Sequence, residues 1–331
     1  MNENLDELFN ENQLNKAIKK GKLKSTIRTA IISLVVTIIV ITIGSYINTK
    51  TSIIMSEQFY KENEEFVKLT VPNGYISESI DNIGFLGGTS TYKVSKAIGY
   101  KSVVVQEMAS KFGYSFTNPI LKFFGSSPYF PMYRGSGGYT VQSNGDGWPL
   151  NRTQTGYRRI MFFHPEIKYK NYKNDLSKLD EISDDQLIEL AISFDKPYKY
   201  TKVESLLSKV HASWYWLDAY TKDDMKEQKQ MAEVIADKTG TISIDEFNAI
   251  GVNVSPQQFE TGYTDLINIL KNTKLEKYKA IYNEMMAKGY KNYYDVPVLG
   301  AIVYGTKSEL KVLIGNPAIK ASSFGVITSK Y

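Results

Sequence analysis

The side chains that could perform chemistry are few. The 331 residues include no cysteine and only two histidines, His164 and His211. The lack of cysteine excludes disulfides, thiolate metal sites, iron–sulfur clusters and a cysteine nucleophile. Two imidazoles are too few for a histidine-rich metal site, and we expect both to be hydrogen-bonded structural residues. Neither the nucleophile elbow G-x-S-x-G nor the zinc helix H-E-x-x-H occurs.

Adjacent acids occur at Asp184-Asp185 and at Asp223-Asp224. They lie beside turn or helix-start residues, where carboxylates cap helices and face solvent. A carboxylate pair suited to glycoside hydrolysis is an alternative, but nothing in the sequence selects one pair over another. We therefore predict no catalytic residues, no cofactor, no metal site and a protein that is not an enzyme.

Two strings resemble ligand-binding motifs. In ADKTGTISIDEF, Gly240 and Glu246 match the sixth and twelfth positions of a calcium loop, but the first ligand position falls on Ile235, which has no side-chain oxygen. The string that starts at Gly300 resembles a Walker A loop, but an extra threonine separates Gly305 from Lys307. We expect neither calcium nor nucleotide binding.

The longest apolar run lies near the N-terminus. Residues 29–49 carry no charge and are bounded by Arg28 and Lys50. As a helix, these 21 residues extend about 31 Å, which matches a bilayer core of roughly 30 Å. A buried core helix and a cleaved signal peptide are the alternatives. The 28 preceding residues are long for a signal peptide, and no Ala-x-Ala-like site follows. We predict one transmembrane helix.

The charges that flank this run predict its orientation. Six basic side chains precede it, namely Lys16, Lys19, Lys20, Lys22, Lys24 and Arg28. The other flank has Lys50 and soon becomes acidic, at Glu57 and Glu62. The positive-inside rule therefore places the N-terminus in the cytoplasm and residues 50–331 outside the cell. The net charge of +5 is small for a nucleic-acid binder, so we predict no direct nucleic-acid contact.

The cytoplasmic segment, residues 1–28, is too short to fold alone. Its apolar residues occur at helical spacing and would form stripes on a short helix: Leu5, Leu8, Phe9, Leu14 and Ile18. Such stripes dock in the groove of a partner or lie on a membrane. The acidic first half disfavours binding to anionic lipid alone, and the basic second half is explained as a topology determinant and lipid contact.

The outer part divides by composition into a helical stalk over residues 50–66 and two folded regions, residues 67–165 and 180–331. Long loops rich in glycine, serine and proline fill residues 125–156. Aromatic and basic side chains in these loops either anchor them to the core or line a ligand surface: Tyr129, Tyr133, Arg134, Tyr139 and Trp148.

The second folded region contains two similar strand–helix–strand units. The first unit consists of a strand over 185–198, a T-x-x-E box at Thr201, a short helix and a strand over 212–220. The second unit consists of a strand over 298–305, a T-x-x-E box at Thr306, a helix and a strand over 319–328. Two helices over 257–289 form an insertion. We predict an α+β fold of the split βαβ kind, with helices on one face of the sheet.

The strings LIELAISFDKPY, VESLL, ASWYWLDAY and GAIVYGTKSELKVLIGNPAIKASSFGVI resemble the C-terminal domain of the sigma factor regulator family, membrane-bound anti-sigma factors of Gram-positive bacteria. The string FNENQLNKAIKKGKLKSTIRTAIISLVV resembles the matching N-terminal domain, which carries the anchor. The loops over 125–156 and the helical insertion have no counterpart in this resemblance.

The resemblance implies a regulator whose cytoplasmic segment holds an extracytoplasmic-function sigma factor inactive while its outer domain senses the envelope or contacts a second membrane protein. The apolar residues of the segment would then face the sigma factor. The alternative from another class is an extracellular binding or scaffolding module without a role in transcription, for which the N-terminus is only a topology signal.

Overall fold

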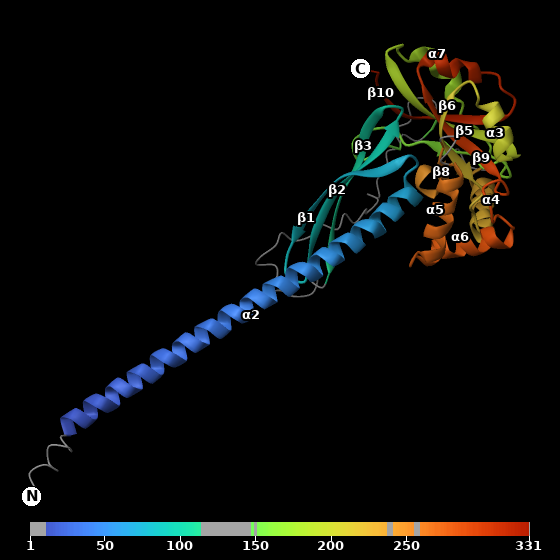
Figure 1. The fold of residues 1–331 in the computed structure, drawn as a ribbon. Coiled ribbons are helices and arrows are strands. Elements are labelled where there is room, and N and C mark those ends of the chain that lie inside the picture. The colour runs from blue at the N-terminus through green and yellow to red at the C-terminus, as the bar shows by residue number, and fades with distance from the viewer. Residues whose placement is uncertain (1–10, 114–146, 149–150, 237–240, 255–258, 331) are drawn as a thin grey trace, which may run out of the picture. The chain divides into compact units, whose positions relative to one another are not determined.

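A computed structural model of the chain describes residues 11–113, 147–148, 151–236, 241–254 and 259–330 (Figure 1). The described residues divide into two compact units. The first unit contains residues 11–57, 82–89 and 111–113, and the second contains residues 58–81, 90–110 and the described residues from 147 onward.

The helix α2 (Glu11–Thr70) is continuous over 60 residues. It contains the apolar run, is long and apolar enough to cross a membrane, and does not bury this run against the described protein. Threonines inside the run satisfy their hydroxyls within the helix, because Thr37 and Thr42 donate to carbonyls four residues earlier at 2.8 Å. The helical continuation predicted for residues 50–66 is confirmed.

Three strands follow and form a sheet in chain order: β1 (Gly74–Ile83), β2 (Gly87–Ile98) and β3 (Lys101–Gly113). Three residues, 84–86, connect β1 to β2. The turn requires left-handed backbone at Leu86 (φ 50°), and Gly87 has a positive φ of 153°. A Cβ on Gly87 would lie 2.3 Å from the carbonyl oxygen of Phe112, so only glycine fits there.

The C-terminal region is built on a five-stranded sheet with the order β10-β5-β9-β6-β8. Its strands are β5 (Gln186–Tyr198), β6 (His211–Leu217), β8 (Gly251–Asn253), β9 (Val298–Gly305) and β10 (Ile319–Ser329). All four neighbouring pairs are antiparallel. The helix α3 (Tyr200–Leu206) connects β5 to β6, and α7 (Lys307–Leu310) with η4 (Lys311–Leu313) connects β9 to β10. The structure thus combines one long apolar helix with a mixed helix-and-sheet region, as predicted.

Successive side chains along each strand point to opposite faces of the sheet, and both faces are buried. Ile188, Leu190 and Ile192 pack with α3, α7 and the two helices of the insertion, α5 (Phe259–Asn272) and α6 (Glu276–Ala287). Trp214 and Trp216 lie in a separate cluster with residues of β4 (Met161–Phe162) and β7 (Ile244–Asp245). The remaining elements are η2 (Asp175–Glu181), α4 (Lys222–Ala236) and η3 (Glu246–Asn248).

One of the two predicted capping boxes is correct. At α7 the Glu309 carboxylate accepts from the backbone N–H of Thr306 at 2.7 Å, which confirms the second box. The box predicted at Thr201 is wrong, because α3 begins one residue earlier, at Tyr200. The ring of Tyr200 stacks on Phe259 with centroids 4.4 Å apart, and its hydroxyl donates to the carboxylate of Glu204, so Glu204 does not cap the backbone.

The strand predicted over 212–220 ends three residues early. The chain leaves the sheet after Leu217, where Asp218 N–H donates to the carbonyl of Pro297 at 3.0 Å. Tyr220 nevertheless packs in the cluster of the two tryptophans, and its hydroxyl accepts from the indole N–H of Trp216 at 3.0 Å.

Candidate functional site

The candidate site is the junction, which we define as the part of the second unit where the last turns of α2 meet the sheets. Val67, Leu69 and Val71 are at most 4% exposed. Leu69 belongs to the main core of the five-stranded sheet, and the two valines pack with residues of β2 such as Val94. The end of the helix that carries the apolar run is therefore part of the hydrophobic core of the sheet domain.

Polar contacts also hold the helix end. Glu62 pairs with Lys274, which follows α5, at 2.7 Å, and this hydrogen bond lowers the pKa of the Glu62 carboxyl. The Tyr92 hydroxyl donates to the amide oxygen of Asn63, and burial raises the pKa of this tyrosine to about 12. Asn73, in left-handed backbone after the helix, donates to the Ser213 hydroxyl at 2.8 Å.

A buried charge cluster lies beside this anchor. Lys96 of β2 approaches Glu246 of η3 at 2.7 Å and Glu189 of β5 at 3.4 Å, and all three residues are at most 1% exposed. A second bond satisfies each carboxylate, since Glu189 accepts from Val326 N–H at 2.9 Å and Glu246 from Ile160 N–H at 3.4 Å. The cluster therefore joins β2 to the five-stranded sheet through charged groups removed from water.

The charge states within the cluster follow from burial and proximity. Burial alone would lower the pKa of the Lys96 ammonium, but the two neighbouring carboxylates raise it, so the lysine is charged. Burial raises the pKa of Glu246 despite the attraction of Lys96, and Glu189 adds to the rise by repulsion. Two ionised carboxylates and one ammonium would together carry one net negative charge. The raised pKa of Glu246 disfavours this charge, because it favours protonation of the Glu246 carboxyl.

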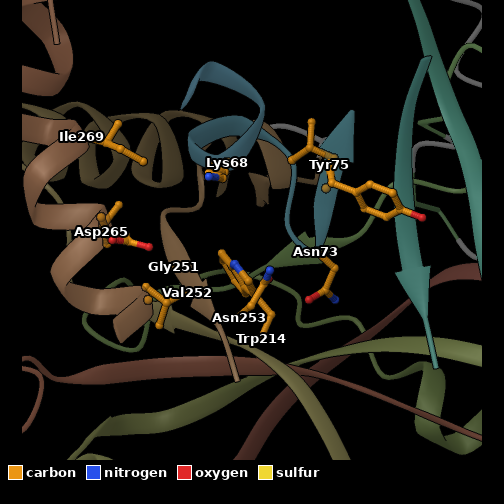
Figure 2. Close-up of a pocket in the computed structure, with 13 residues that line it drawn as sticks. Lys68, Asn73, Tyr75, Trp214, Gly251, Val252, Asn253, Asp265 and Ile269 are labelled. Atoms are coloured by element: carbon orange, nitrogen blue, oxygen red, sulfur yellow. The ribbon is translucent and has the colours of Figure 1, made fainter. Parts of the chain in front are cut away.

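A cavity of about 200 Å³ opens at the junction (Figure 2). Its walls come from the end of α2 and the start of β1, from β6 and the edge strand β8, and from α5: Lys68, Val71, Asn73, Gly74, Tyr75, Trp214, Gly251, Val252, Asn253, Gly262, Asp265, Leu266 and Ile269. The lining combines aliphatic and indole surface with two amides and with the opposite charges of Lys68 and Asp265. Its volume is below the roughly 300–1,000 Å³ of drug-sized pockets, so it suits a small amphipathic molecule.

The sigma-facing residues predicted from the sequence are only partly described. Leu5, Leu8 and Phe9 lie outside the described residues. Leu14 and Ile18 lie one turn apart on α2 and are 54% and 46% exposed. Their role stays a prediction.

The motif-like strings have structural explanations where they are described. Asp237 to Gly240 lie outside the described residues, but Glu246 of the same string is held by Lys96. Lys307 pairs with Asp184 at 2.9 Å instead of serving a phosphate loop. Asp224 accepts from the backbone N–H of Thr221, as expected for a carboxylate at the start of α4. Among the described residues, no group of three metal-ligating side chains occurs.

The two histidines differ in environment. His164 is 2% exposed, its Nδ1 accepts from Glu166 N–H at 3.2 Å, and its ring packs edge-on against Trp216. Burial lowers the pKa of His164 to about 4, so the imidazole is neutral. The expected hydrogen bond is therefore present at Nδ1, whereas the buried Nε2 has no hydrogen-bond partner among the described residues. His211 is exposed and stacks on the ring of Tyr304, with centroids 5.4 Å apart.

The loop aromatics lie mostly outside the described residues, namely Tyr129, Tyr133, Arg134 and Tyr139. Trp148 is buried and meets Phe163 edge-on at 5.5 Å, which confirms that it anchors the chain to the core.

Lys96 and Glu189 are not among the residues predicted from the sequence. The signal for Glu189 is a lone charge in the otherwise apolar run LIELAI of a buried strand, where an ion needs a partner. Nothing local identifies Lys96 as that partner, because 93 residues separate the two.

Comparison with family models decides the assignment. The model described as Sigma factor regulator N-terminal matches residues 15–103, and the model described as Sigma factor regulator C-terminal matches residues 179–326. The chain belongs to the sigma factor regulator family. No curated protein and no solved structure matches it. The sigma factor regulator N-terminal match extends beyond α2 through β1 and β2, so it includes Lys96. The sigma factor regulator C-terminal match includes both inserted helices.

Proposed function

We propose that this chain is a membrane-anchored anti-sigma factor that sequesters an extracytoplasmic-function sigma factor in a Gram-positive cell and senses the state of the envelope. The supporting observation is the continuous helix α2, which links the basic N-terminal segment to the core of the sheet domain within a family of sigma factor regulators. In this proposal the segments are a cytoplasmic piece (1–28), a span (29–49), a stalk (50–66) and outer regions (67–165 and 180–331).

The cytoplasmic contact is proposed for the apolar residues Leu5, Leu8, Phe9, Leu14 and Ile18. The exposure of Leu14 and Ile18 on α2 supports it, because two aliphatic side chains one turn apart form the start of a helical docking stripe. A single helix buries a small interface. Tethering the sigma factor at the bilayer raises its effective concentration and adds to the inhibition.

The outer domain is proposed to regulate rather than catalyse. The family is regulatory, and at the junction Lys96 pairs with Glu246 and Lys274 with Glu62. We further propose that its sheet is a pair of interlocked split βαβ units. This is supported by β9 lying between β5 and β6, and by β5 lying between β9 and β10. The lipid bilayer and a second membrane protein are the other proposed contacts.

The test compares two variants of the full chain that gain the same charge. Leu8→Asp with Phe9→Asp removes two apolar side chains, whereas Asn10→Asp with Asn12→Asp adds two acids beside them. The first pair is expected to release the sigma factor, measured by transcription from its promoters and by mass spectrometry of proteins that co-purify from membranes. The second pair is expected to retain it.

Deletion of residues 2–14 separates the two classes of function. A sigma factor that co-purifies with the full chain and is lost on deletion supports the anti-sigma proposal. If no sigma factor co-purifies with either form, while both insert in the membrane, the proposal is wrong and the chain is an extracellular binding or scaffolding module.

A further inference from the structure

The tip of the β1–β2 hairpin, which we define as residues 83–87, is fastened to α2 within the first unit. The amide of Asn48 donates to the carbonyl of Gly84 at 3.0 Å and accepts from Leu86 N–H at 2.6 Å. Ser52, one turn later on α2, accepts from Gly87 N–H at 3.0 Å and is fully buried. Asn48 therefore holds the turn by both of its amide groups.

These contacts lie at the end of the apolar run. Asn48 is the penultimate residue of the run, and Ser52 lies three residues beyond its end. At 1.5 Å per residue, Ser52 is about 5 Å past the end of the run. A bilayer with a core of roughly 30 Å and a total thickness of 40–45 Å has about 5–8 Å of headgroup region on each side. If the run spans the core, the bonds to the tip fall within this region.

The tip presents apolar side chains that the described protein does not cover. Phe85, at the middle of the fastened turn, is 60% exposed, and Ile83 is 44% exposed. On the helix itself, Tyr46 before Ser52 and Ile54 after it are 65% and 63% exposed. The bonds from Asn48 to the residues before and after Phe85 hold the backbone of the turn, so the turn presents this exposed ring from a fixed backbone.

We propose that the tip of this hairpin is a lipid-contacting site, with Phe85 inserted at the headgroup–acyl boundary of the outer leaflet. Aromatic rings are favoured at this depth, and the exposed Phe85 and Ile83 of the tip make a lipid surface the occupant that their chemistry fits. The inference rests on the proposed membrane span. The strand β2, which begins at the tip, ends with the buried Lys96 and Ile98.

The absence of cysteine permits a direct measurement of depth. Single-cysteine forms of the full chain are labelled with the environment-sensitive fluorophore NBD and reconstituted in nanodiscs of neutral phosphatidylcholine, since apolar insertion does not need anionic lipid. Phe85→Cys is the test position. Val35→Cys, inside the run and exposed, reports the core, and Glu57→Cys, exposed on the same helix beyond the run, reports water.

The expected result is a blue-shifted emission at Phe85→Cys, with quenching by spin-labelled lipid and protection from iodide relative to Glu57→Cys. If the probe at Phe85→Cys is as accessible to iodide as that at Glu57→Cys, while the probe at Val35→Cys is quenched by lipid, the hairpin inference is overturned and the span stands. If the probe at Val35→Cys is itself accessible to iodide, the span fails, and the hairpin inference fails with it.

Discussion

Removal of the Lys96 ammonium tests whether the buried charge cluster stabilises the sheet domain. In Lys96→Met, a side chain of similar length leaves Glu189 and Glu246 facing each other without a cation. Both carboxylates are at most 1% exposed and lie within 3.4 Å of the lysine nitrogen, so water cannot replace it without opening the core.

The expected cost is about 3–5 kcal/mol at pH 7, the usual effect of breaking a buried ion pair by removing one partner. A domain of this size unfolds with a free energy of roughly 5–15 kcal/mol, so the variant loses about a fifth or more of its stability. At about 2–4 °C per kcal/mol, the melting temperature should fall by on the order of 10 °C.

The loss should depend on pH with a definite sign. Burial raises the folded-state pKa of Glu246 above its unfolded value. A carboxyl with a raised pKa contributes stability below the unfolded pKa and loses it as pH rises through the folded pKa. Without Lys96 the folded pKa rises further. The melting temperature of Lys96→Met should therefore fall between pH 5 and pH 7 more steeply than that of the parent chain.

Thermal unfolding in nanodiscs, followed by near-ultraviolet circular dichroism, measures this effect. Lys93→Met is the matched control, since Lys93 lies on the same strand and pairs with Glu78 at 2.7 Å, but its side chain is 39% exposed. We expect it to leave the melting temperature nearly unchanged. Lys96→Met combined with Glu189→Gln and Glu246→Gln should recover much of the loss. Equal melting temperatures for Lys96→Met and Lys93→Met at pH 7 would refute the reasoning.

Three further predictions concern stability. The folded pKa of His164 is lowered from 6.5 to about 4. The parent chain should therefore lose about 3 kcal/mol of stability as pH falls from 6.5 to about 4. His164→Phe should flatten this part of the plot of unfolding free energy against pH. In urea titrations, Gly251→Ala should cost at least about 2 kcal/mol, because the Cβ of the alanine would lie 2.0 Å from the backbone carbonyl oxygen of Tyr215. Gly262→Ala, whose nearest contacts are at 3.6 Å, should be neutral or stabilising by up to about 1 kcal/mol. Glu309→Ala, which removes a capping box, should cost about 1 kcal/mol in the same titrations.

Local patterns made much of the sheet domain predictable. The strands β5, β9 and β10 lie within one residue of their predicted bounds. These bounds depend on local features, namely the apolar pattern of the strand and the turn residues that flank it, which can be identified from the sequence alone. The failed cap at Thr201 shows the limit: the competing signal is the stacking of Tyr200 on Phe259, which is distant in sequence. The box at Thr306 has no such competitor.

The contacts of the junction and those of the hairpin tip were each beyond prediction for the same reason. Lys96 and Glu246 are 150 residues apart, and Asn48 meets Gly84 across 36 residues. A polar residue inside a strand or near the end of a span indicates that a partner exists, but not which residue it is. The apolar residues proposed to face the sigma factor were read from helical spacing alone, so only the pull-down and reporter experiments decide them.

The energetics of the helix anchor constrain how a signal crosses the junction. Val67, Leu69 and Val71 are nearly fully buried, and each contributes roughly 1.5–3 kcal/mol, so withdrawing all three costs about 5–9 kcal/mol before any polar contact is lost. A ligand that reverses a two-state equilibrium from 1:99 to 99:1 must discriminate between the states by about 5.5 kcal/mol. The free energy needed to undock α2 is therefore comparable to, or larger than, the difference in binding free energy that such a ligand can supply. The Glu62–Lys274 pair is about half exposed or more at both ends and contributes little, so it can exchange at small cost. A signal received by the sheet domain, as proposed above, is therefore expected to shift or rotate α2 together with the buried residues at its end, rather than to release the helix from the core.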